Sequence, residues 1–348
     1  MRRVLRRVNA ALLLVAALAA GVLAVAQTVP PVAGDEHVRG PEQTLLTFPE
    51  WFLVFSPQEY ADYTATHLPS SFPYYGHIAQ FWQSYEKVSA EVNRRELDLN
   101  PGYHLMIMVI GVSTTVEYAL RSAYERLIGR LSEVLSAQPT AEDRYAAKVA
   151  KDYVDFIRVL PWYEYDFAAR LRGLWTDTGY WGPDALRKWE RKFALSTEYG
   201  IKMLYGKLIK FGTKSVYEEP QLVTAVVTLT VPAPDAKLPA VKLLKALPDG
   251  RALITVPRYE AFSVYAQALA GKGLNFEEIA GNRGFILVSL LTPRDWTAPL
   301  DLSVLFTQPI LTRPDGQRAV LTVRVNSLAM HLRKWQLAGQ KVEHIFDY

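Results

Sequence analysis

Four titratable side chains in the first half of the chain could carry acid–base chemistry: Glu50, His77, Glu164 and Asp166. Glu164 and Asp166 lie among aromatic residues, and desolvation by rings can raise the pKa of a carboxyl group into the range of a general acid. A hydrolase, or an enzyme that modifies lipids or glycans, could use such groups if they met in one pocket. The four residues are therefore our candidate catalytic set.

Three of these residues also have purely structural explanations. Residues i and i+2 of a helix point about 200° apart, so a helical Glu164 and Asp166 would not share a substrate. Asp166 lies four residues before Arg170, its expected ion-pair partner. Glu50 follows a proline in what we predict to be the first turn of a helix, where the helix dipole favours a carboxylate. These explanations favour a protein without a reaction centre.

Several kinds of chemistry lack their residues in this sequence. The chain has no cysteine, which excludes disulfides, thiolate metal sites and cysteine nucleophiles. Its 6 histidines form neither an HxxxH nor an HExxH pattern, and there is no Walker A motif, nucleophile elbow or dinucleotide fingerprint. We therefore predict no metal site and no cofactor.

The net charge does not indicate nucleic-acid binding. The chain has 348 residues, and its 39 basic residues exceed the 35 acidic ones by four. The first seven residues contain four arginines, which account for this whole excess: Arg2, Arg3, Arg6 and Arg7. The remaining chain is neutral and offers no basic field for phosphates. Half of the residues are hydrophobic, which is typical of a folded chain of two or three domains.

An uncharged apolar stretch, residues 8–29, follows these arginines. About 20 such residues cross a bilayer as a helix, so we predict a signal anchor within residues 1–34. A cleaved signal peptide that ends after Ala26 is the alternative. In both interpretations the arginines keep the N-terminus in the cytoplasm and the rest of the chain is exported. We expect a single-pass protein of a bacterial-type inner membrane.

A second apolar segment covers residues 99–116. We predict a buried core helix here, because proline, asparagine, serine and threonine dilute the segment. The alternative is a second membrane crossing, in which the segment near 100–116 returns the C-terminal half to the cytoplasm.

Helical signals dominate residues 35–219, which we predict to form a domain of roughly six helices. Ser56 and Pro57 resemble a helix start with a capping box, and the segment that begins at Thr140 opens another helix. In the last of these helices, the charges at Arg187, Glu190 and Arg191 are expected to form an exposed salt-bridge cluster.

The pattern changes to strands in residues 220–348, and this domain contains an internal repeat. Residues 248–256 are echoed by residues 314–323, each beginning with Pro-Asp-Gly, which favours a turn between antiparallel strands. A helix and a strand follow in both copies, so each copy, near 240–280 and 302–347, reads as ββαβ. The arrangement resembles ferredoxin-like topology, a likeness of architecture only. The predicted fold class is α+β: a membrane helix, a helical domain and a repeated α+β domain.

These expectations favour a membrane-anchored, exported accessory or binding protein of the cell envelope that acts through a protein partner or as a homo-oligomer. The alternative is a membrane-anchored hydrolase or lipid- or glycan-modifying enzyme with a carboxylate site in the helical domain. A structural component of an envelope transport system is a third hypothesis.

Overall fold

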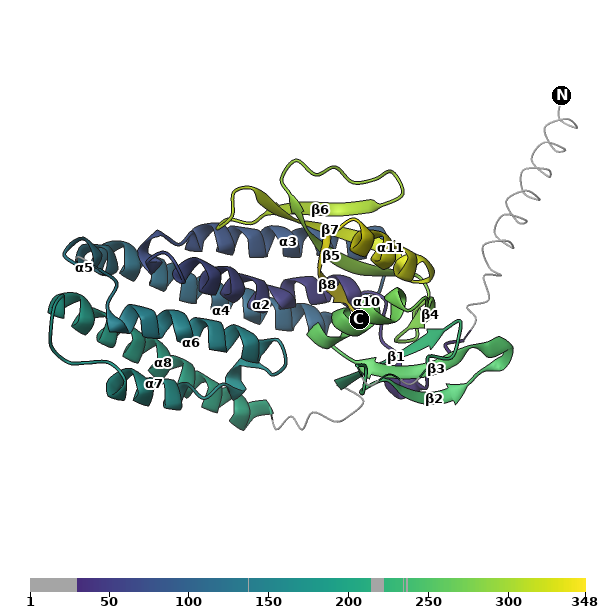
Figure 1. The fold of residues 1–348 in the computed structure, drawn as a ribbon, viewed down its shortest axis with the longest axis horizontal. Coiled ribbons are helices and arrows are strands. Elements are labelled where there is room, and N and C mark those ends of the chain that lie inside the picture. Colours follow the sequence, from purple (N-terminus) through teal and green to yellow (C-terminus); the bar gives the residue numbers. More distant parts are fainter. Residues whose placement is uncertain (1–29, 137, 214–221, 234, 236) are drawn as a thin grey trace, which may run out of the picture. The chain divides into compact units, whose positions relative to one another are not determined.

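The computed structural model describes residues 30–348 except 137, 214–221, 234 and 236. Residues 33–348 form one compact unit, separate from residues 1–32. The predicted signal anchor falls almost wholly on residues 1–29, and the predicted domain boundary at 219/220 falls on residues 214–221. Both therefore lie outside the described residues. The described chain combines helices with two antiparallel four-stranded sheets, which agrees with the predicted α+β class (Figure 1).

Helices make up the described part of residues 35–213. The principal ones are α2 (Gln43–Thr64), α3 (Tyr74–Arg94), α4 (Pro101–Tyr124), α5 (Arg130–Val134), α6 (Ala141–Ile157), α7 (Phe167–Thr176) and α8 (Ala185–Thr213). Short turns of other helix types lie before and between them: η1 (Asp35–His37), η2 (Pro69–Ser71), η3 (Glu125–Gly129) and η4 (Trp162–Glu164). Thr140 caps α6 with a complete capping box, at the helix start predicted from the sequence.

The predicted helix start at Ser56 is wrong. Helix α2 passes without interruption through Pro49 and Pro57, each of which removes one backbone hydrogen bond. The helix continues because its apolar side chains, including Phe48 and Phe52, are fully packed on both sides of the prolines. Ser56 is consequently in mid-helix, where its hydroxyl contacts other side chains instead of a helix N-terminus.

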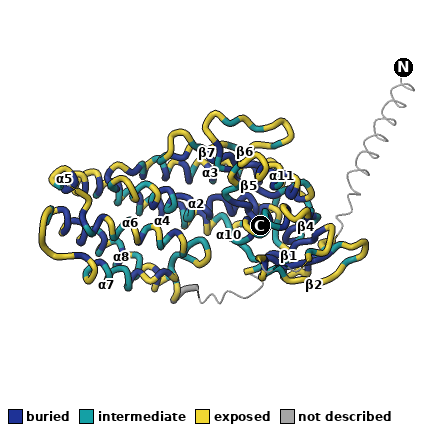
Figure 2. The backbone as a smooth tube through the Cα atoms, viewed as in Figure 1, coloured by how far each residue is buried: buried dark blue, intermediate teal, exposed yellow. Residues whose placement is uncertain are grey.

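The predicted burial of residues 99–116 on all sides is also wrong. Helix α4 continues through the π-helical turn η3 into α5, and this helix, Pro101–Val134, is long and apolar enough to cross a membrane. Only 22% of its apolar window is buried, because one side faces the protein and the other side is exposed. Figure 2 colours the chain by the burial of each residue. The buried side packs on α3, where Gly111 lies against the rings of Phe81 and Trp82.

The two sheets have corresponding strand orders. The first is β2-β3-β1-β4 and the second is β6-β7-β5-β8, with every neighbouring pair antiparallel. Their strands are β1 (Val223–Thr228), β2 (Lys242–Ala246), β3 (Ala252–Pro257), β4 (Phe276–Ile279), β5 (Phe285–Pro293), β6 (Ser303–Pro309), β7 (Gly316–Arg324) and β8 (Lys341–Phe346). Helix α10 (Glu260–Gly271) joins β3 to β4, and α11 (Val325–Leu337) joins β7 to β8. Both predicted Pro-Asp-Gly turns connect antiparallel strands, the first as the short helical turn η5 (Pro248–Gly250).

Helix α2 attaches the helical part to the second sheet. Phe48 packs against Phe346 of β8 and Phe306 of β6, with ring centroids 5.4 and 5.2 Å apart. The Thr44 hydroxyl accepts a hydrogen bond from the backbone N–H of Leu287 (2.9 Å) and donates one to the carbonyl of Phe346 (2.6 Å). One core is therefore shared by the first described long helix and the last strand of the chain.

Candidate functional site

The four candidate catalytic residues make their contacts in separate places. Glu50, on α2, accepts a hydrogen bond from the Tyr103 hydroxyl at 2.6 Å. Burial raises the pKa of Glu50, an effect that this hydrogen bond opposes. Glu50 is the eighth residue of α2, so the predicted interaction with the first turn of a helix is wrong. A partly buried carboxylate held by one phenol is a satisfied structural pair.

Glu164 and Asp166 flank Tyr165 at the start of α7. Glu164 forms an ion pair with Lys210 of α8 at 2.8 Å, and both side chains are 44% exposed. Asp166 caps α7 by accepting a hydrogen bond from the backbone N–H of Ala169 at 2.8 Å. The ion pair expected between Asp166 and Arg170 is replaced, since Arg170 lies 3.6 Å from Asp152 instead.

His77, on α3, belongs to a buried chain of polar groups. Its Nδ1 lies 3.0 Å from the Ser56 hydroxyl, and its Nε2 lies 3.6 Å from the Glu59 carboxylate. Burial lowers the pKa of His77 to about 3, so the ring is neutral at pH 7. Glu59 continues the chain to Arg318 of β7, at 3.3 Å.

This arrangement of a serine, a histidine and a glutamate resembles a nucleophile with its base, but it lacks access for a substrate. All three residues are at most 6% exposed, and the Ser56 hydroxyl is already 2.7 Å from the Tyr118 hydroxyl. The groups therefore tie α2, α3, α4 and the second sheet together. Sequence reasoning missed Ser56 and Glu59, because the signals around them predicted a helix start.

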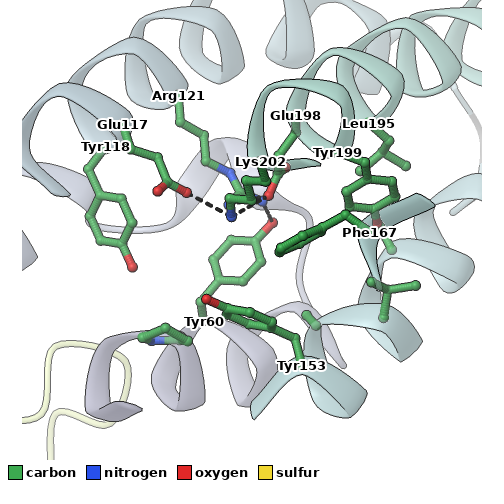
Figure 3. Close-up of a pocket in the computed structure, with 14 residues that line it drawn as sticks. Tyr60, Glu117, Tyr118, Arg121, Tyr153, Phe167, Leu195, Glu198, Tyr199 and Lys202 are labelled. Atoms are coloured by element: carbon green, nitrogen blue, oxygen red, sulfur yellow. Dashed lines mark hydrogen bonds and ion pairs between the residues drawn. The ribbon is translucent and has the colours of Figure 1, made fainter. Parts of the chain in front are cut away.

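A cavity of about 60 Å³ lies between α2, α4, α6 and α8 (Figure 3). Two acids and two bases meet at its wall: Glu117 and Arg121 of α4, and Glu198 and Lys202 of α8. Lys202 lies 2.9 Å from Glu117 and 3.0 Å from Glu198, and Arg121 lies 3.4 Å from Glu198. The two negative and two positive charges cancel. We call these four residues the ion quartet.

Aromatic rings lie beside the ion quartet, among them those of Tyr60, Tyr153 and Phe167 (Figure 3). The Arg121 guanidinium stacks over Tyr60, 4.2 Å from the ring centroid, and donates a 2.6 Å hydrogen bond to its hydroxyl. The Lys202 ammonium lies 5.6 Å from the ring centre of Tyr153. Both cations are therefore held by carboxylates and rings of the chain itself, and the remaining space suits a few water molecules rather than an organic substrate.

A second ionic cluster lies deeper in the helices, and here the predicted exposure is wrong. Arg187, Glu190 and Arg191 are all at most 9% exposed. Arg187 binds Asp143 of α6 at 2.7 Å, and Arg191 binds Glu125 of η3 at 2.9 Å. The predicted helix-face cluster is thus turned inward, where partners from α6 and η3 compensate its charges.

The outer side of α4 has the opposite chemistry. Apart from Glu117, whose side chain is 42% exposed beside Lys202, the exposed side chains of α4 are uncharged. Most are large and apolar, with Leu105 67% and Leu120 68% exposed. The stripe continues beyond α4 on Leu127, Leu131 and Val134. Helical spacing places these residues along one side of the helix.

Helix α8 has a matching stripe. From Leu186 to Tyr205 its exposed residues are also uncharged. The large apolar members of the stripe are Leu186, Phe193, Ile201, Leu204 and Leu208. We call the stripes of α4–α5 and α8 together the apolar face.

The contacts between the two helices place both stripes on the same side. Glu117 meets Lys202, Arg121 meets Glu198, and the rings of Tyr124 and Phe193 lie 6.4 Å apart, so the helices are antiparallel. Successive helical residues are about 100° apart, and these contacts therefore fix how each helix is rotated. Both exposed stripes therefore lie on the same side of the α4–α8 helix pair, with the ion quartet between them.

Within the described residues, no group of three His, Asp or Glu side chains could hold a metal ion. The chain matches no protein-family model, no curated protein and no solved structure. The arrangement that distinguishes it is a helical half with charged groups inside and a continuous apolar face outside.

Proposed function

We propose that this protein is a membrane-anchored accessory protein of the cell envelope that acts by binding rather than by catalysis. The observation that carries the proposal is the apolar face: a long exposed surface of α4, α5 and α8 that contains a row of leucines and valines. Monomeric soluble proteins rarely expose contiguous apolar surface on this scale, and such surfaces mark contacts with proteins or membranes.

The arrangement of the candidate catalytic residues supports the same proposal. Glu50, His77, Glu164 and Asp166 are each engaged with a different partner: Tyr103, Ser56, Lys210 and the N-terminus of α7. A catalytic set must lie within hydrogen-bond reach of one substrate. The enzyme hypothesis required these four residues to share a pocket, and their separate contacts favour binding.

The proposed setting is the one that the sequence predicts. Residues 8–29 would anchor the chain in a bacterial-type inner membrane, with the compact unit exported. The proposed duplication of the α+β half, with a ferredoxin-like likeness, is supported by the matching strand orders of its sheets. In each sheet a helix joins two strands that flank a third, as in a split βαβ unit.

Purification of the full-length protein tests this proposal. A C-terminal affinity tag and a mild detergent would recover the protein from membranes, and its companions and mass would be measured by mass spectrometry and light scattering. We expect a stoichiometric protein partner or a homo-oligomer. A protein that emerges repeatedly as a lone monomer would overturn the accessory role.

A further inference from the structure

We propose that the apolar face lies in a single leaflet of a lipid bilayer, with the axes of α4 and α8 in the plane of the membrane. This inference deepens the proposed function and rests on it, because it assigns the apolar face to lipid and leaves the polar surfaces to a protein partner. Four features of the described residues carry it.

The first feature is the length of the α4–α5 stripe. From Leu105 to Leu135 it extends over about 45 Å at 1.5 Å per residue, whereas the hydrocarbon core of a bilayer is about 30 Å thick. Exposed apolar residues occupy this whole length. A helix that stood across the membrane would leave part of the stripe in water, while a helix parallel to the surface can immerse all of it.

The second feature is the charge on the helices that flank α8. Helix α6 runs along α8, from the ion pair between Asp143 and Arg187 to the contact between Tyr153 and Lys202. Its exposed residues over this length include Arg144, Lys148 and Lys151. If α8 crossed the bilayer, these cations would be in hydrocarbon too.

The cost of that arrangement decides between the two orientations. Each charged side chain at the centre of a bilayer costs about 2.5–3.5 kcal/mol on insertion scales. Helix α7 also packs on α8, and its Arg172 is exposed as well. An in-plane orientation leaves all of these groups in water, because only the side of the helices that carries the apolar face enters the leaflet.

The third feature is the set of charges at the ends of the two stripes. In the described parts of η3, α5 and α8, every exposed charged residue is basic: Arg126, Arg130, Lys207 and Lys210. Two of them also have acidic partners in the chain, since Lys210 pairs with Glu164 and Arg130 lies 3.6 Å from Glu133. Basic side chains at the border of an apolar helix surface extend toward anionic head groups, with their methylene stems in the apolar layer.

The fourth feature is the aromatic residues at the edge of the apolar face. Trp181 is 79% exposed, and Trp189 and Tyr205 are each more than a third exposed. Tryptophan and tyrosine are enriched at the level of lipid head groups, where one part of the ring system is apolar and another is polar. Exposed aromatic residues together with basic residues at one border match a surface of anionic head groups.

The absence of cysteine from the chain allows a direct test in the full-length protein. Single cysteines would be placed on the apolar face as Val112→Cys, Leu127→Cys and Leu204→Cys, with Gln83→Cys and Lys148→Cys as controls on exposed sites of α3 and α6. Each variant, checked for folding by circular dichroism, would be labelled with an environment-sensitive fluorophore and reconstituted into phosphatidylcholine–phosphatidylglycerol vesicles. Quenching would be measured with iodide and with lipids that carry a nitroxide near the head group or deep in the acyl chain.

We expect blue-shifted emission at the three face positions, with similar quenching by the shallow nitroxide. The two control positions should be quenched by iodide alone. Deep quenching at Val112→Cys with shallow quenching at Leu127→Cys would show a crossing helix and overturn the proposal. Protection from iodide and from the nitroxide lipids would show that a protein covers the apolar face. Quenching by iodide at all positions would show that the apolar face is in water. Either result would also overturn the proposal.

These outcomes separate the inference from the proposed function. Lipid contact in a protein that purifies alone would support the orientation and remove the accessory role. A stoichiometric companion, found together with an apolar face that is protected from lipid, would support the accessory role and overturn the membrane orientation.

Discussion

Glu117 of α4 and Lys202 of α8 form a 2.9 Å ion pair across the seam between the two helices that carry the apolar face. Lys202 also holds Glu198, and its side chain is only 18% exposed. Removing Lys202 takes this partner away from the largely buried carboxylate of Glu198 and from the 42% exposed carboxylate of Glu117, which costs about 3 kcal/mol. We predict this loss for Lys202→Met, measured by urea unfolding in mild detergent. Lys207→Met, an exposed site on the same helix, is the control and should change stability by less than about 0.5 kcal/mol.

Arg187 is predicted to be the most sensitive position of the deeper cluster. Its guanidinium binds Asp143 and Glu190 and also donates a 3.1 Å hydrogen bond to the carbonyl of Gly129. Arg187→Leu should lower the free energy of unfolding by about 3–5 kcal/mol, because buried carboxylates lose their partner. Arg187→Lys keeps the charge but loses the forked geometry, and a smaller loss is expected. Equal losses in the two variants would show that packing, not charge, dominates.

The lowered pKa of His77 should make the folded protein less stable in acid. Its pKa is about 3 in the folded protein and about 6.5 when unperturbed, so below pH 6.5 the unfolded state binds the proton first. Stability should therefore fall as the pH drops from about 6.5 toward 3, with a contribution of up to about 1.4 kcal/mol per pH unit. Glu59 acts in the opposite direction, because burial raises its pKa and the folded state takes up a proton first.

The comparison of wild type with His77→Gln isolates the histidine, since Glu59 is present in both proteins. Unfolding free energies would be measured at several pH values below 7. The variant should show a shallower decline than wild type toward acid. Parallel curves would contradict the assignment of a neutral, buried His77.

Two glycines provide a matched test of the contact between α3 and α4. A Cβ atom at Gly111 would lie 2.3 Å from Phe81 and 2.9 Å from Trp82, whereas at Gly200 of α8 nothing lies within 4 Å. Gly111→Ala should destabilise the protein by about 1–3 kcal/mol, because the rings must shift. Gly200→Ala should stabilise it by up to about 1 kcal/mol through helix propensity. Thermal unfolding followed by circular dichroism would measure both changes.

Substitutions of Glu50 and Tyr103 test whether Glu50 is part of a structural pair or is a catalytic carboxylate. Tyr103→Phe removes the 2.6 Å hydrogen bond to Glu50 and should cost about 1–3 kcal/mol. Glu50→Gln keeps an acceptor for the phenol, and we expect a loss below about 1 kcal/mol with binding of any companion unchanged. If Glu50→Gln kept its stability but lost a hydrolase or lipid- or glycan-modifying activity that the wild type shows, the enzyme hypothesis would be restored.

The sequence predicted those elements whose cause is local. The helix start at Thr140 and the Pro-Asp-Gly turns depend on residues within one turn of each other, and the structure confirms them. The start at Ser56 was predicted from equally local signals, but residues buried on both sides of Pro57, such as Phe55 and Ala61, carry α2 through it. Local signals therefore fail where tertiary contacts outweigh one missing hydrogen bond.

The burial of charged groups could not be read from spacing. Charged residues three and four positions apart have the same sequence spacing on a solvent-exposed helix face and on a face that packs against another helix. The partners of Arg187 and Arg191 are 44 and 66 residues away, at Asp143 and Glu125. The apolar stripe of α4 was hidden for a related reason, since composition alone does not tell which side of an apolar helix is covered.

The hydrogen bonds of Thr44 have a consequence for biogenesis. Thr44 leaves the ribosome 302 residues before its acceptor Phe346, so the environment of the first long helix stays incomplete until synthesis has almost finished. Phe48 and its neighbours are exposed throughout that interval, which makes the nascent chain a client for chaperones. A premature stop codon that removes only β8 would thus open the helical half as well, and the shortened product would be degraded by proteases rather than accumulate as a folded fragment.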